Sequence, residues 1–159
     1  MKRISMFLGL VLLGYTGTAW SQECRVTVSP MNFGNYRPLF GAPLDTTAKI
    51  NVTCERGVPF TVKLARDQFS GRRGDHQRHL VASDGGKNLR FGLYRDSARQ
   101  EVWGDGTGRT FVVTGTGTGR PVSLTVYGRI PARQNVPAEL YSDDIIVIVE
   151  SGPGSRRSR

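Results

Sequence analysis

Helical periodicity is almost absent from this 159-residue sequence, and so are most residues that build metal or catalytic sites. Cysteine occurs only as Cys24 and Cys54, and histidine only as His76 and His79. Zinc would need at least two further ligands near the cysteines, and the histidines lie in a polar stretch without a helical pattern. No Ser/His/Asp, Cys/His or paired-carboxylate arrangement stands out. We therefore expect no metal, no cofactor and no enzyme activity.

Long apolar runs are also missing. The apolar stretch Met6–Leu13 is far shorter than the roughly 20 residues that a membrane-spanning helix needs. Lys2 and Arg3 precede this stretch, and small residues leading to Ser21 follow it. This layout is typical of a secretory signal peptide, and we expect cleavage after Ser21. The mature chain is then exported without a membrane span.

Three parts are therefore expected: a signal peptide over residues 1–21, one domain over residues 22–151, and a disordered basic tail over residues 152–159. The chain has 22 Lys and Arg against 13 Asp and Glu, with a formal net charge of +9 at pH 7. Export makes nucleic acid an unexpected partner. The excess charge indicates a solvated basic face or contact with an anionic glycan.

The two cysteines favour a disulfide bond, because an even count in an oxidising compartment is typical of a structural bridge. Cys24 and Cys54 each fall on the apolar phase of an alternating segment, so a buried bridge between neighbouring strands is geometrically plausible. Closing a loop of this length should stabilise the fold by about 3–4 kcal/mol.

Alternation of apolar and polar residues recurs along the chain and predicts strands with one buried face. The segments are Cys24–Val28, Lys49–Cys54, Phe60–Leu64, Leu89–Leu93, Phe111–Val113 and Val122–Val126. Turn formers separate them, at Pro38–Pro43, Asp84–Gly86, Gly104–Gly108, Gly115–Gly119 and Pro131–Pro137. The polar, Arg-rich segment Phe69–His79 is expected to be a loop. Short strands at this spacing favour an all-β, immunoglobulin-like sandwich.

The last expected strand departs from this alternation. Ile145–Val149 is apolar at every position. A strand that is apolar on both faces is either buried on both or contacts something beyond its own sheet. No further apolar strand follows Val149 to close the sandwich.

Several short motifs, in this order and spacing, resemble one known family. They are Cys24–Val28, Asn32–Tyr36, Asp45, Ile50–Cys54, Leu93–Asp96, Val102–Gly108, Gly115–Gly119, Leu124–Pro131, Gln134–Pro137 and Tyr141–Asp143. The sequence resembles the spore coat protein U domain, which is shared by the Csu-type subunits of archaic chaperone–usher pili.

This resemblance implies an incomplete immunoglobulin-like sandwich that lacks its last strand. A periplasmic chaperone fills the resulting groove with its own strand. At an outer-membrane usher, the extension of a neighbouring pilin subunit replaces the chaperone strand by donor-strand addition. We expect Ile145, Val147, Val149, Val126 and Leu124 to line the groove or its edge. The implied function is a structural or adhesive subunit of a surface pilus, active in attachment and biofilm formation.

Two departures from the family pattern are informative. Ile146 and Ile148 stand where typical members carry Thr. After the expected cleavage only Gln22 and Glu23 precede Cys24, which leaves no donor strand and predicts a position at the fibre tip. The alternatives are a self-associating coat or matrix protein and a free-standing extracellular binding module for anionic glycans.

Overall fold

A computed structural model gives the structure of the chain and describes residues 24–39, 41–66 and 77–152. The expected signal peptide and all but the first residue of the expected basic tail lie outside these ranges. The described part contains nine β-strands and no helix. The strands are β1 (Arg25–Val28), β2 (Leu44–Thr53), β3 (Pro59–Leu64), β4 (Arg78–Ala82), β5 (Leu89–Tyr94), β6 (Val113–Thr116), β7 (Val122–Ile130), β8 (Tyr141–Ser142) and β9 (Val147–Ser151).

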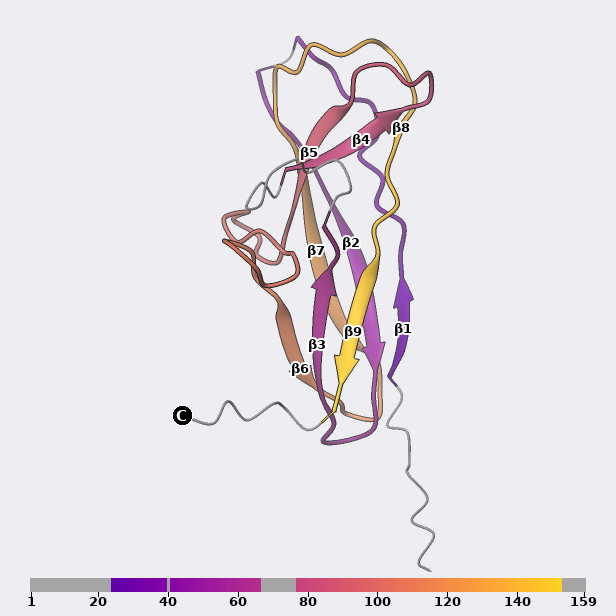
Figure 1. Cartoon of the computed structure of the whole chain (residues 1–159), viewed down its shortest axis with the longest axis vertical. Helices are drawn as coiled ribbons and strands as arrows, with labels where there is room; N and C mark the ends of the chain where they lie inside the picture. Colours follow the sequence, from indigo (N-terminus) through magenta and orange to yellow (C-terminus); the bar gives the residue numbers. More distant parts are fainter. Residues whose placement is uncertain (1–23, 40, 67–76, 153–159) are drawn as a thin grey trace, which may run out of the picture.

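Two antiparallel sheets form a sandwich. One has six strands in the order β1-β2-β7-β5-β4-β8, and the other has three in the order β6-β3-β9. Figure 1 shows β3 and β9 lying across the face of β2 and β7. The expectation of an all-β, immunoglobulin-like sandwich is confirmed.

The core lies between the sheets and is built from alternate residues of each strand. β2 contributes Ala48, Ile50 and Val52, β3 contributes Phe60, Val62 and Leu64, and β5 contributes Leu89, Phe91 and Leu93. Trp103 lies among them, and its indole Nε1 donates a hydrogen bond to the Val62 carbonyl at 3.1 Å. These are the apolar positions of the alternating segments, because one face of each strand must leave water.

Two strands, β4 and β8, are not anticipated by the alternation. Arg78 and His79 lie in β4, so the end of the expected loop Phe69–His79 is wrong, whereas residues 67–76 lie outside the described part. Phe111 was expected in a strand, but β6 begins only at Val113, and Phe111 makes an isolated bridge to Trp103. The Arg95 guanidinium lies 4.4 Å from the centre of the Phe111 ring, which gives this half-exposed ring a partner outside the core.

The disulfide bond between Cys24 and Cys54 is confirmed. It joins the residue before β1 to the residue after β2, with their Cα atoms 4.4 Å apart. Cys54 is buried. The bond therefore fixes the start of an edge strand to its only neighbour in the described part of the sheet.

Replacing both cysteines by serine is expected to lower the free energy of unfolding by about 3–4 kcal/mol, because a loop with a sequence separation of 30 is no longer closed in the unfolded chain. Urea unfolding of the mature chain, followed by Trp103 fluorescence, measures the difference. Wild-type chain treated with a reductant serves as the control. An unchanged unfolding midpoint in both samples would contradict a stabilising role for the bond.

The Gly104–Gly108 segment is a turn held by Asp105. The Asp105 carboxylate accepts hydrogen bonds from the Thr107 amide at 2.9 Å and from Arg66 Nε at 3.0 Å. Desolvation raises the pKa of Asp105, but the hydrogen bonds from Thr107 and the charge of Arg66 outweigh it and lower the pKa to about 2. The ionised carboxylate is therefore stabilised by the fold.

The substitution Asp105→Asn is expected to lower stability at neutral pH by about 1–3 kcal/mol, because charge-assisted hydrogen bonds are lost. A lowered pKa in the folded chain stabilises it fully above the unfolded value of 3.8, and this stabilisation disappears as the pH falls through about 2. The gap between wild type and variant should therefore close between pH 4 and pH 2 in urea titrations. A gap that stays constant with pH would count against this assignment.

Candidate functional site

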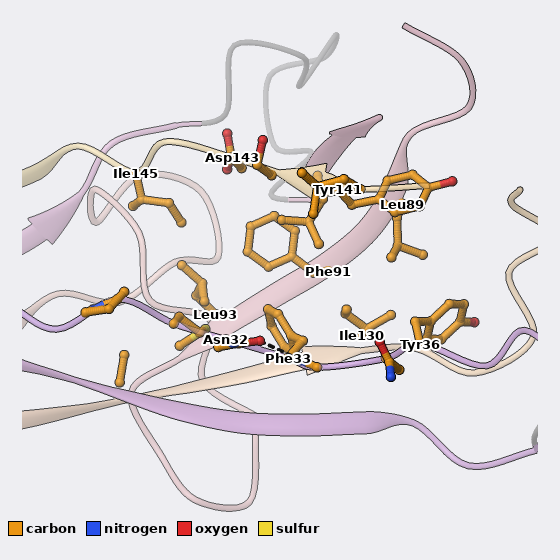
Figure 2. A pocket seen from close by; sticks show the side chains of 18 of the residues that line it. Asn32, Phe33, Tyr36, Leu89, Phe91, Leu93, Ile130, Tyr141, Asp143 and Ile145 are labelled. Atoms are coloured by element: carbon orange, nitrogen blue, oxygen red, sulfur yellow. Dashed lines mark hydrogen bonds between the residues drawn. The ribbon is translucent and has the colours of Figure 1, made fainter. Parts of the chain in front are cut away.

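A groove of about 1330 Å³ opens along one side of the sandwich, and we call it the open groove. One wall is residues 28–36, which comprise the end of β1 and the segment after it. The other wall is residues 135–145 together with Val147. Figure 2 shows Tyr141, Asp143 and Ile145 along one side, Asn32, Phe33 and Tyr36 along the other, and Phe91 and Leu93 between them.

The floor of the open groove is the hydrophobic core itself. Its apolar members are Ala48, Ile50, Leu64, Leu89, Phe91, Leu93, Val126 and Ile130. Val28 pairs with Ile50, and its side chain shares the inward face of the sheet, yet it is 52% exposed. An inward apolar side chain with that exposure indicates that a layer of side chains is missing above it.

Two free sheet edges flank this groove. Within the described part of the chain, β1 pairs only with β2, and β9 pairs only with β3. Each therefore carries unpaired backbone N–H and C=O groups along its outer side. The last residue of β1, Val28, and the first residue of β9, Val147, line the groove, so a strand laid in the groove would meet the ends of both edges.

Tyr36 ties the two walls together. Its hydroxyl donates to the Pro131 carbonyl at 3.0 Å and accepts a hydrogen bond from the Gln134 amide at 2.8 Å. The buried Gln134 side chain accepts from the Arg90 amide at 2.9 Å and donates to the Arg90 carbonyl at 2.8 Å. The hydrogen bonds of Tyr36 and Gln134 hold both walls against β5. The groove therefore has its shape before a ligand enters it.

A close approach between the first wall and β7 requires a glycine. A Cβ atom on Gly128 would lie 2.6 Å from Met31 Sδ and 2.8 Å from Phe33 Cζ. Phe33 also packs edge-on against Phe91, with ring centroids 6.0 Å apart. Because Gly128 has no side chain, Met31 and Phe33 of the first wall can pack directly on β7.

Of the five residues expected at the groove, Val126, Ile145 and Val147 line it. Leu124 and Val149 are partly buried and pack against the core, but they are not part of the lining. The sequence pattern missed the first wall, because residues 29–36 form no strand and show no alternation. The only signal for that wall was the Asn32–Tyr36 motif.

The last strand is not buried on both faces, which leaves the other alternative, contact with something beyond its own sheet, as a prediction. β9 begins at Val147, and Ile145 and Ile146 precede it. Ile146 is 67% exposed and Ile148 is 40% exposed, because both point away from the core on a sheet with no further layer over it in the described part of the chain. The two isoleucines are available for contact with another molecule.

Every charged residue in the lining of the open groove is acidic: Glu139, Asp143 and Asp144. Glu139 accepts a hydrogen bond from the Ser83 hydroxyl at 2.5 Å. Burial raises the pKa of Tyr141, and the negative charges of Asp84 and Glu139 raise it further. All three carboxylates therefore lie on the second wall of the groove.

The other motifs place no second site in the described residues. His79 lies in β4, and His76 lies outside the described part. No group of three His, Cys, Asp or Glu side chains there is arranged to hold a metal ion, and no helix there has the length and hydropathy to cross a membrane.

The Spore Coat Protein U domain model matches residues 12–148 of the chain. The chain belongs to this family. It is 29% identical over 132 residues to Protein U of Myxococcus xanthus, which covers 75% of this chain and 70% of that protein.

The fold is similar to one chain in a solved complex. That complex holds the chaperone CsuC and the tip adhesion subunit CsuE, from archaic chaperone–usher Csu pili of Acinetobacter baumannii. The TM-score is 0.53 at 20% identity, and the match covers 80% of this chain and 39% of that chain. The present chain thus matches well under half of the length of that solved chain.

Replacing Tyr36 by Phe is expected to lower the free energy of unfolding by about 1–3 kcal/mol, since the partly buried Gln134 amide loses its acceptor. Tyr141→Phe is the matched control, because its hydroxyl makes one exposed bond to the Pro137 carbonyl and should cost less than about 1 kcal/mol. Urea unfolding of both variants gives the comparison. Equal losses would show that Tyr36 is not a tie between the walls.

Proposed function

We propose that the chain is a subunit of a chaperone–usher pilus and that the open groove holds a β-strand supplied by another protein. The observation that carries this proposal is the groove itself, which reaches down to the core between its two walls, leaves the inward-facing Val28 half exposed and meets the ends of two unpaired sheet edges at Val28 and Val147. Membership of the Spore Coat Protein U domain family and the shared fold with a chaperone-bound pilus subunit support it.

A strand fits the groove better than a compact ligand does. Backbone groups of an inserted strand can pair with β1 on one side and β9 on the other, which extends both sheets. Alternate side chains then point down onto Phe91, Leu93 and the rest of the floor. The β1 and β9 arrows point in opposite directions in Figure 1, so the inserted strand is antiparallel to one and parallel to the other.

The proposed partners follow an assembly order. A periplasmic pilus chaperone first fills the groove, and at an outer-membrane usher a neighbouring pilin subunit replaces it. The disulfide supports passage through an oxidising compartment. The resulting fibre lies on the cell surface, where it serves attachment and biofilm formation. A place at the fibre tip belongs to the proposal. It depends on cleavage after Ser21, because Cys24 is held in the domain by its bond to Cys54 and only residues ahead of it could serve as a donor strand.

A self-associating coat protein is the second candidate. The family description and the exposed Ile146 and Ile148, which lie beside the free edge of β9, favour it. In that case copies of the chain contact each other without a dedicated chaperone. The two functions differ in what binds first, so the test below separates them.

The substitution Ile145→Asp is expected to weaken binding of a co-expressed cognate chaperone by about tenfold or more, because a carboxylate would be buried in the apolar groove. Ile146→Asp is the matched control. Ile146 follows Ile145 in the chain, but its side chain points to solvent and is not part of the lining. Co-purification and titration of the one-to-one complex measure both variants.

Ile146→Asp should retain chaperone binding. A chain that is stable and soluble alone, with no affinity for the chaperone in either form, would falsify the pilus proposal. If Ile146→Asp instead abolishes self-assembly of a chaperone-free chain, the coat function is favoured.

A further inference from the structure

The charge along the open groove is opposite to the charge of the chain. The whole sequence carries 22 Lys and Arg against 13 Asp and Glu. In the groove the balance is reversed, because Glu139, Asp143 and Asp144 are its charged lining residues and no Lys or Arg from the described part lines it. The charge of the groove lining is therefore negative, whereas the net charge of the whole chain is positive.

These acids gather in one stretch of the second wall. Residues 139–144 contain all three, and Asp144 is exposed and makes no ion pair with another residue in the described ranges. Asp84, in the turn after β4, adds a further negative charge near Tyr141. The rest of the lining is apolar or uncharged, so the acidic residues of the groove all lie on its second wall.

The acidic stretch borders the path of any strand that fills the groove. Such a strand turns alternate side chains toward the floor and the others outward, past the rim. An outward side chain that passes residues 139–144 meets carboxylates within the range where charges on the two partners interact. A Lys or Arg there is attracted, and an Asp or Glu is repelled.

We propose that the strand that occupies the open groove in the assembled fibre comes from a neighbouring subunit and carries a Lys or Arg side chain where it passes residues 139–144. This inference rests on the proposed function and adds a rule of recognition to it. The apolar floor supplies affinity for strands in general, and the acidic rim selects among them and sets their register.

Competition between two synthetic peptides tests the inference. Both contain the same alternating Val-Thr core of about ten residues, and one is flanked by Lys whereas the other is flanked by Glu. The mature chain, unfolded with its disulfide intact, is diluted into an equal mixture of the two at low ionic strength. Native mass spectrometry then gives the ratio of the two complexes.

We expect the complex with the Lys peptide to exceed the complex with the Glu peptide by about fivefold, the range of a few exposed ion pairs. The formal net charge of the full sequence is +9, and without Lys2 and Arg3 the mature chain still carries +7. This charge would favour the Glu peptide, so a preference for Lys identifies the groove. In about 1 M salt the ratio should approach one, because the screening length falls to about 3 Å.

Charge reversal locates the effect. Asp144→Lys combined with Glu139→Lys should abolish or invert the preference. Asp144→Lys alone should weaken the preference, whereas Glu55→Lys, an equal charge change at an exposed turn residue outside the lining, should preserve it. Equal binding of both peptides to the wild type overturns the charge rule and leaves the groove proposal standing. No complex with either peptide contradicts the proposed function itself and this inference with it.

Discussion

The open groove, an apolar seam between residues 28–36 and residues 135–147, is the constraint on which the rest of the structure depends. Elsewhere the two sheets cover each other's inward faces, and side chains such as Val62 and Phe60 are withdrawn from water. Along the seam the same core is reached by the open groove. Exposed apolar surface costs about 25 cal/mol per Å², so covering this seam drives the chain toward a partner.

Polar contacts keep that seam open instead of letting it collapse. The Tyr36 hydroxyl and the Gln134 side chain fix both walls through hydrogen bonds to backbone groups, and Gly128 admits the first wall over β7. A cleft that is shaped in advance loses less conformational entropy when a strand enters it. The fixed walls therefore favour binding, because few of their motions remain to be lost on association.

Alternation in the sequence located β2, β3, β5 and β7 because each of them has one face on the core. It missed β4 and β8, since Arg78 and His79 interrupt the apolar phase and β8 has only two residues. Val126, Ile145 and Val147 could be assigned to the groove from the family resemblance together with the apolar positions of these segments. The first wall could not, because its position depends on Tyr36 contacting Pro131, 95 positions away in the chain.

The Cys24–Cys54 bond has a mechanical consequence. A pull applied ahead of Cys24 reaches Cys54 directly through the covalent link. From there it passes into β2, which is paired with β7 along nearly its whole length and with β1 over Ile50–Thr53. The hydrogen bonds between β1 and β2 carry little of the load. The disulfide therefore holds the start of β1 against β2 even when the hydrogen bonds between the two strands open.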